Sequence, residues 1–213
     1  MEGYKRNQME EAISLLVDEG SAPSLGLRTK VKRLLDTDRN LGLKPRSKDP
    51  ESASYAFYSR NAPGRGSEVW FSSYEVFALL EALNLMEHGS TQARAVSILR
   101  RARPALEPKH AAILRWDPAE LFDEQKIRES ARPGSLAVWS TRPVFLVLAS
   151  RKGSATEQSS DVEVAILEAD QLTPFSRKRP GFLWSITELT RTAHDLRDAL
   201  GTTTASKRGR GSS

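Results

Sequence analysis

The segment SYAFYSRNAPGRGSEVWFS, residues 54–72, divides the chain into its predicted parts. Two short aromatic-rich arms flank a Pro-Gly-Arg-Gly loop, and large apolar residues in each arm alternate with smaller or more polar ones. This alternation is typical of strands, and glycine and proline favour a turn between them. We therefore predict a β-hairpin with residues 55–57 in one arm, residues 69–71 in the other and Arg65 at the tip.

Two helices are predicted before this hairpin. Asn7 and Glu10 match a capping box at the start of the first helix, and Ser24 is the expected N-cap of the second. Asp38 projects toward the apolar stripe of the second helix, so it either pairs with a basic group or marks the end of regular packing. That stripe consists of Leu27, Val31, Leu34, Leu35 and Leu41, and the opposite face carries Thr29, Lys32, Arg33, Asp36 and Asn40, flanked by Arg28 and Arg39.

Helices and strands follow the hairpin in turn. Ser72 and Glu75 match a second capping box, which opens an apolar helix ended by Gly89. Thr91 caps a further helix that carries its arginines outward and ends at Pro104. The remaining predicted elements are helices over residues 108–116 and 117–131, strands over residues 136–140, 143–150, 162–172 and 182–184, and a final helix over residues 186–200 with a capping box at Ser185 and Glu188.

This order predicts an α+β fold. A helical N-terminal half with a winged-helix-like β-hairpin precedes a small, mostly antiparallel sheet with a C-terminal helix. We divide the chain into a helical domain over residues 1–103, a helical connector over 104–134, a small α+β domain over 135–200 and a disordered basic tail over 201–213.

The charge of the chain is unevenly placed. The net charge is +5, but residues 28–48 alone hold eight Lys and Arg against two Asp, and residues 94–115 hold six basic side chains against one acidic. Residues 116–129 are acidic. Clustered basic charge favours a polyanion as partner.

Composition excludes several kinds of chemistry. The chain has no cysteine, which excludes disulfides, thiolate zinc sites, cysteine nucleophiles and iron–sulfur clusters. No apolar run approaches the roughly 18 residues of a membrane span, and the N-terminus lacks an apolar signal-peptide core, so we expect a cytoplasmic protein.

The sequence contains no pattern typical of a catalytic or metal site. His88, His110 and His194 lack the spacing of metal ligands; His88 fits a helix C-terminus and His110 a half-buried position. Neither a phosphate-binding glycine loop nor a serine-nucleophile motif occurs. We therefore expect no catalytic residue, no metal and no cofactor.

One nuclease-like pattern runs against this expectation. Asp161, Glu163 and Glu168 lie on or next to a predicted strand and resemble the Mg²⁺-binding carboxylates of restriction-type nucleases. Ala165 stands where those folds carry lysine, and solvent-facing strand acids explain the pattern more simply.

The order helix, helix, hairpin, helix, helix between Tyr4 and Arg103 resembles the winged helix-turn-helix domain of the MerR family of bacterial regulators. The nearest local likeness is SSYEVFALLEALNLMEHGSTQARAVSILRR, residues 72–101, in which an apolar helix, a glycine turn and a second helix follow one another. The chain departs from the family in the longer link between its first two helices, and in having Pro104 and Pro108 where the family has a long coiled coil.

The resemblance implies DNA binding, with the second helix in the major groove and the hairpin loop at the backbone. By position, the DNA-binding residues would be Arg28, Thr29, Lys32, Arg33 and Arg65. We therefore predict a non-catalytic DNA-binding or transcriptional regulatory protein of bacterial type, acting on double-stranded DNA as a homodimer. The alternative is a protein-interaction module whose partner is acidic, and an enzyme of unrecognised type comes third.

Overall fold

The computed structural model describes residues 3–17, 20, 22–59, 69–131, 138–151 and 162–204. In this part of the chain the helices are α1 (Arg6–Val17), α2 (Leu25–Asn40), α3 (Pro50–Ala53), α4 (Ser73–Glu87), α5 (Gln92–Ile113), α6 (Pro118–Leu121), α7 (Glu124–Ser130), α8 (Ala169–Arg177) and α9 (Thr190–Thr202). The strands are β1 (Tyr4–Lys5), β2 (Trp70–Phe71), β3 (Val144–Arg151), β4 (Val162–Glu168) and β5 (Phe182–Glu188). The predicted α+β class, with an antiparallel sheet and a C-terminal helix, is confirmed.

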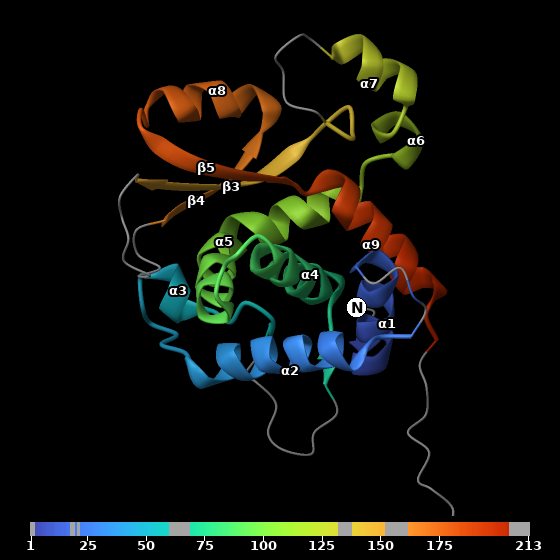
Figure 1. Cartoon of the computed structure of the whole chain (residues 1–213), viewed down its shortest axis with the longest axis vertical. Coiled ribbons are helices and arrows are strands. Elements are labelled where there is room, and N and C mark those ends of the chain that lie inside the picture. The colour runs from blue at the N-terminus through green and yellow to red at the C-terminus, as the bar shows by residue number, and fades with distance from the viewer. Residues whose placement is uncertain are drawn as a thin grey trace, which may run out of the picture.

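These elements form layers (Figure 1). Helix α2 lies along one side of the molecule, α4 and α5 occupy the middle, and the sheet lies on the other side, with α8 over its outer face. The sheet has the order β4-β3-β5 with antiparallel neighbours. Its central strand, β3, is a continuous apolar run, as a strand covered on both faces requires. The sheet and α2 therefore lie on opposite sides of the α4–α5 layer, and the sheet does not cover α2.

Helix α4 is the centre of the core, as its apolar composition predicts. Its predicted capping box is present: the Glu75 backbone N–H donates to Ser72 Oγ at 3.2 Å, and the Ser72 backbone N–H donates to Glu75 Oε2 at 2.7 Å. The helix ends at His88, and Gly89 follows with a φ of 86°, a left-handed conformation that favours glycine. Both predicted ends of this helix are confirmed.

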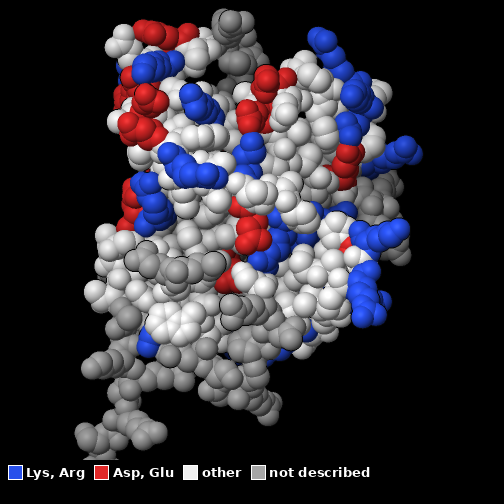
Figure 2. All heavy atoms as spheres, turned by 180° about the vertical axis from the view of Figure 1, so that it is seen from behind, with Lys and Arg blue, Asp and Glu red and all other residues white. Residues whose placement is uncertain are grey.

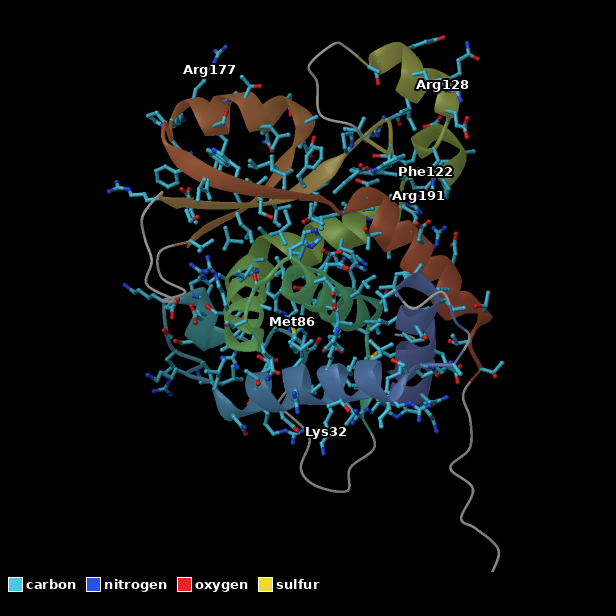
Figure 3. The ribbon with its side chains drawn as sticks, viewed as in Figure 1. Lys32, Met86, Phe122, Arg128, Arg177 and Arg191 are labelled. Carbon is cyan, nitrogen blue, oxygen red and sulfur yellow. The ribbon has the colours of Figure 1, made fainter. Side chains whose placement is uncertain are left out.

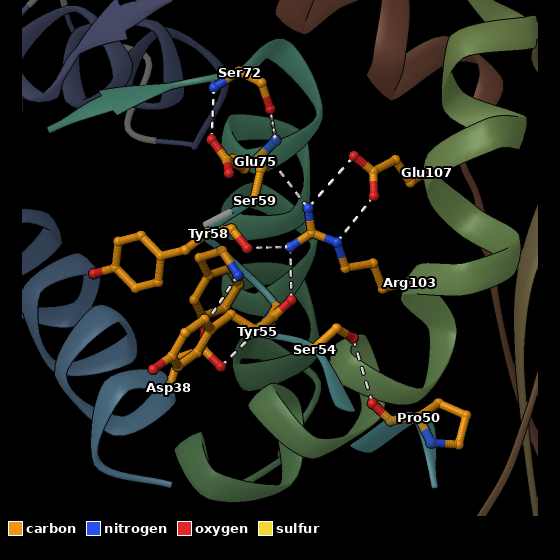
Figure 4. Close-up of polar contacts among 12 residues, drawn as sticks. Asp38, Pro50, Ser54, Tyr55, Tyr58, Ser59, Ser72, Glu75, Arg103 and Glu107 are labelled. Atoms are coloured by element: carbon orange, nitrogen blue, oxygen red, sulfur yellow. Dashed lines mark hydrogen bonds and ion pairs between the residues drawn. The ribbon is translucent and has the colours of Figure 1, made fainter. Parts of the chain in front are cut away.

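The predicted hairpin is wrong in its first arm. Residues 55–58 form no strand, and β2 pairs instead with β1, Phe71 opposite Tyr4. Side chains bind the backbone of residues 55–58 in place of a second strand (Figure 4): the Arg103 guanidinium donates to the carbonyl oxygens of Tyr55 and Tyr58, each at 2.7 Å. Backbone polar groups satisfied in this way need no ladder partner. The predicted tip, Arg65, lies outside the described residues.

The predicted end of the fourth helix at Pro104 is also wrong. Helix α5 continues through Pro104 and Pro108 to Ile113. Both prolines are exposed, so their rings lie on the solvent side of the helix, away from its packed face. The predicted outward direction of the arginines is wrong for Arg100 and Arg103, which are buried.

Other boundaries differ more locally. Strand β4 ends at Glu168, and α8 replaces the predicted strand end and loop. Strand β5 continues to Glu188 through the expected capping box, so α9 begins at Thr190 instead. The predicted helix over residues 117–131 is divided into α6 and α7, and the described residues 138–140 of the predicted strand 136–140 are not in a strand.

The proposed division at residue 103 falls inside α5. One hydrophobic cluster runs from Met9 of α1 to Leu200 of α9 and includes Val144 and Leu146 from the inner face of the sheet. The N-terminal and C-terminal elements therefore bury their apolar faces against one another. Residues 201–202 belong to α9, and the tail from residue 205 lies outside the described residues.

Candidate nucleic-acid interface

Helix α2 is amphipathic and held with its basic face outward. Its start is as predicted, since Ser24 Oγ accepts a hydrogen bond from the Leu27 backbone N–H at 3.1 Å. Leu27, Val31, Leu34 and Leu35 are buried, and the buried stripe fixes which side of the helix meets solvent.

The ambiguity at Asp38 is resolved by a buried ion pair at the C-terminal end of α2. Arg100 of α5 donates from Nε to Asp38 Oδ1 at 2.7 Å, and both side chains are almost fully buried. Asp38 also accepts hydrogen bonds from the backbone N–H groups of Ala56 and Phe57, at 3.1 and 3.0 Å. Further donors of Arg100 reach the carbonyl oxygens of Gly42 at 2.9 Å and Glu51 at 3.1 Å. This network joins α2 to α5 and to the segment that follows α2.

The predicted DNA-binding residues of α2 share its solvent side but differ in their contacts. Arg28 is exposed and lies 3.8 Å from Glu10 Oε2. Thr29 Oγ1 donates to the Leu25 carbonyl oxygen at 2.8 Å, so its hydroxyl is engaged within the helix. Lys32 and Arg33 are exposed and form no ion pair with any described residue. Figure 3 shows Lys32 on the outer side of α2, pointing away from the core.

Basic side chains continue beyond the helix. Lys44, Arg46 and Lys48, between α2 and α3, are exposed and extend the surface beyond the predicted site residues. All eight Lys and Arg of residues 28–48 are exposed, whereas Asp38, one of the two acidic residues there, is buried. We call these eight side chains the α2 basic face; its members are Arg28, Lys30, Lys32, Arg33, Arg39, Lys44, Arg46 and Lys48.

The face seen from behind carries different charges at its two lateral edges (Figure 2). Lys and Arg dominate the edge near α3 and the C-terminal end of α2, whereas acidic and basic side chains are mixed over α6 and α7. The α2 basic face is not free of acids: Lys30 pairs with Glu87 at 2.5 Å, and Arg39 lies 3.5 Å from Asp36. Lys32, Arg33 and the cations of residues 44–48 are the members with no described acidic partner.

The second basic stretch, residues 94–115, is largely internal. Arg100 and Arg103 are buried and donate to carboxylate and carbonyl oxygens. Arg101 is partly buried beside Glu51, and Lys109 pairs with Glu168 at 2.7 Å. Two basic stretches of the sequence thus have different structural roles: the side chains of the first lie on the surface, and those of the second mainly hold elements together.

Two groups in the α4–α5 core have strongly shifted pKa values but lie apart from this face. Glu81 is fully buried, and its carboxylate forms only a long hydrogen bond with Asn84, at 3.5 Å. This burial raises the pKa of Glu81 to about 8. Burial also lowers the pKa of His110, stacked on Phe77 at 4.6 Å, to about 4. Both groups are therefore predominantly uncharged at neutral pH, and both lie in the core, apart from the α2 basic face.

The described residues offer no metal centre, since nowhere among them do three His, Asp or Glu side chains converge in a suitable group. Glu163, one of the nuclease-like carboxylates, is engaged in an ion pair with Arg179. In the same part of the chain, no helix combines the length and hydropathy required to cross a bilayer.

Comparison of the chain with protein-family models, curated proteins and solved structures finds no match to any of the three. The interpretation of the α2 basic face therefore depends on its own geometry and charge.

Proposed function

We propose that this protein binds double-stranded DNA non-catalytically through the α2 basic face, as a DNA-binding or transcriptional regulatory protein. The observation that carries the proposal is that all eight basic side chains of residues 28–48 are exposed, while Asp38 is buried and neutralised by Arg100. Lysine and arginine on an open surface neutralise phosphates and release counterions.

The dimensions of the face fit a duplex. At 100° per residue, Arg28, Lys32 and Arg39 fall within a sector of about 40°, and at 1.5 Å per residue they span about 16 Å along α2. The major groove of B-DNA is about 12 Å wide, so cations along this length reach phosphates on both of its edges. Lys32 lies in this sector and has no described acidic partner, so it is the member best placed for such contacts. Arg33 also lacks a described acidic partner and lies about 100° around the helix from Lys32.

The test is the salt dependence of binding to a random duplex of about 25 base pairs, followed by fluorescence anisotropy. We expect the logarithm of the binding constant to fall linearly with the logarithm of salt concentration. The Lys32→Ala/Arg33→Ala variant should weaken binding and reduce that slope by about two, because each lost phosphate contact removes about 0.9.

The matched control is Lys126→Ala/Arg128→Ala on α7. Both of its side chains are exposed, so this variant loses the same charge from a different part of the surface. If both variants weaken duplex binding equally, net charge alone drives binding, and the proposed site on α2 is contradicted.

The runner-up is an acidic protein partner for the same face. Absence of duplex binding at about 50 mM salt, together with Lys32-dependent binding of a polyglutamate peptide, would favour it. Sedimentation of the free protein and its DNA complex tests the associated proposal of a homodimer, which paired half-sites would require.

A further inference from the structure

A large cavity lies on the side of the sheet that faces away from α2. The inner face of the sheet packs on the α4–α5 layer, whereas the outer face is covered by α8 and flanked by α7 (Figure 1). Between them is a cavity of about 980 Å³. Its floor is formed by Phe145 and Val147 of β3 with Trp184 and Ile186 of β5, and α8 contributes Leu172 and Phe175.

Apolar and aromatic side chains dominate this cavity. Phe145 and Val147 are almost fully buried, and Trp184 meets Phe175 edge to face at 5.6 Å. Trp139 also lines the cavity and is 67% exposed. A volume of this size falls at the upper end of small-molecule sites, which are about 300–1,000 Å³ and mostly apolar.

Most polar groups of the cavity are already occupied. Among its hydroxyl groups, those of Ser130, Ser140, Thr141 and Ser176 donate to protein oxygens. Arg128 is the charged residue among the described lining, and it pairs with Glu124 at 3.0 Å. No buried polar atom of the described lining lacks a hydrogen-bond partner. A ligand rich in charge or hydroxyl groups would therefore lose its hydration without gaining strong partners.

We propose that the cavity between the outer sheet face, α7 and α8 binds an uncharged, apolar small molecule with an aromatic or compact aliphatic body. Burial of the apolar surface that Trp139, Phe175 and Trp184 still expose supplies the affinity, and edge-to-face contacts with these rings orient the ligand. The site goes beyond the proposed DNA contact, and it stands or fails independently of it, because α2 lies across the α4–α5 layer.

The test uses N-phenyl-1-naphthylamine, an uncharged fluorophore whose emission rises in apolar surroundings, titrated into the full chain. We expect saturable binding of one probe per chain. Thr173→Phe places a ring into the cavity from α8 and should weaken binding about tenfold or more, because it removes the room that the probe needs. Arg177→Phe is the matched control: Arg177 lies on the same helix, does not line the cavity and projects outward (Figure 3), so this variant should bind as the natural chain does.

Ser176→Phe, from the same wall, replaces Thr173→Phe if the latter fails to give the circular dichroism spectrum of the natural chain. Absence of saturable binding, or equal binding by the natural chain and the filled variants, overturns the proposal. Tighter binding of the anionic 8-anilinonaphthalene-1-sulfonate at the same site overturns the uncharged class of ligand. Binding seen only on dissociation of a dimer assigns the cavity to a second copy and overturns it as well.

Discussion

Asp38 is the residue on which the attachment of α2 most directly depends. Its carboxylate accepts hydrogen bonds from Arg100 and from the backbone of Ala56 and Phe57, all in the interior. A buried ion pair contributes little more to the free energy of unfolding than apolar packing would, but removal of one partner leaves the other charge buried and unpaired. The pair therefore makes the position of α2 sensitive to a single change.

We predict that Asp38→Ala lowers the free energy of unfolding by about 3–5 kcal/mol, because it leaves the Arg100 guanidinium buried without its counter-charge. Urea denaturation followed by circular dichroism measures this change. The control is Asp36→Ala, which removes an exposed carboxylate 3.5 Å from Arg39 and should cost less than about 1 kcal/mol. Similar losses from both variants would contradict a special role for the buried pair.

A second prediction at this scale concerns pH. Glu81 has a pKa of about 8 in the folded chain, above its ordinary 4.5, so folding favours the protonated form. Stability due to this group is present below pH 4.5 and is lost as pH rises toward 8, by at most about 1.4 kcal/mol per pH unit. Glu81→Gln should remove this loss, so its stability relative to the natural chain should grow between pH 5 and pH 8 in urea denaturation.

His110 acts in the opposite sense. Its pKa of about 4 lies below the ordinary 6.5, so folding favours the neutral imidazole and stability is lost as pH falls from 6.5 toward 4. The acidic limb should therefore persist in Glu81→Gln. A stability profile in which Glu81→Gln alters only the acidic limb would contradict the assignment of the alkaline limb to Glu81.

Among the elements, α2 and α5 show how the same residue types acquire different roles. Helix α2 contacts the core along one stripe, so its arginines and lysines remain in solvent. Helix α5 packs against α2, α3, α4, α9 and β4, so positions that a helical projection places outward become buried. Whether a basic side chain is exposed or buried thus depends on how many elements pack against its helix.

At the scale of the element, we predict that Ser24→Ala destabilises the chain by about 1 kcal/mol, because the Leu27 N–H loses its acceptor at the start of α2. Thermal unfolding monitored at 222 nm measures the effect. Ser24→Asn is the control, since its side-chain oxygen can accept the same hydrogen bond and asparagine caps helices about as well as serine. A loss from Ser24→Asn as large as that from Ser24→Ala would argue against the cap.

The whole molecule has one continuous core, and this leads to a prediction about cooperativity. Helix α1 packs against α9, and both contribute to the cluster that also holds the inner sheet face. We expect a single unfolding transition, in which far-ultraviolet circular dichroism and tryptophan emission have the same denaturant midpoint. Two separate midpoints would support independent N-terminal and C-terminal domains instead.

A truncation tests the same point directly. The fragment 1–103 ends within α5 and lacks α9, so it should not show a cooperative transition of its own. If the fragment has a folded circular dichroism spectrum and a sharp thermal transition, the single core is contradicted.

Local pattern by itself determined the α+β class, the N-caps of α2, α4 and α5, the end of α4 and the amphipathic character of α2. Each of these depends on interactions within a few residues, such as Ser72 with Glu75, and so is readable from spacing. Only the tertiary structure decided that Asp38 pairs with Arg100, that Arg103 binds residues 55–58 in place of a strand, and that β2 joins β1. The partners in those contacts are distant along the chain, 62 residues apart for Asp38 and Arg100, and no local periodicity encodes which of several arginines meets which backbone group.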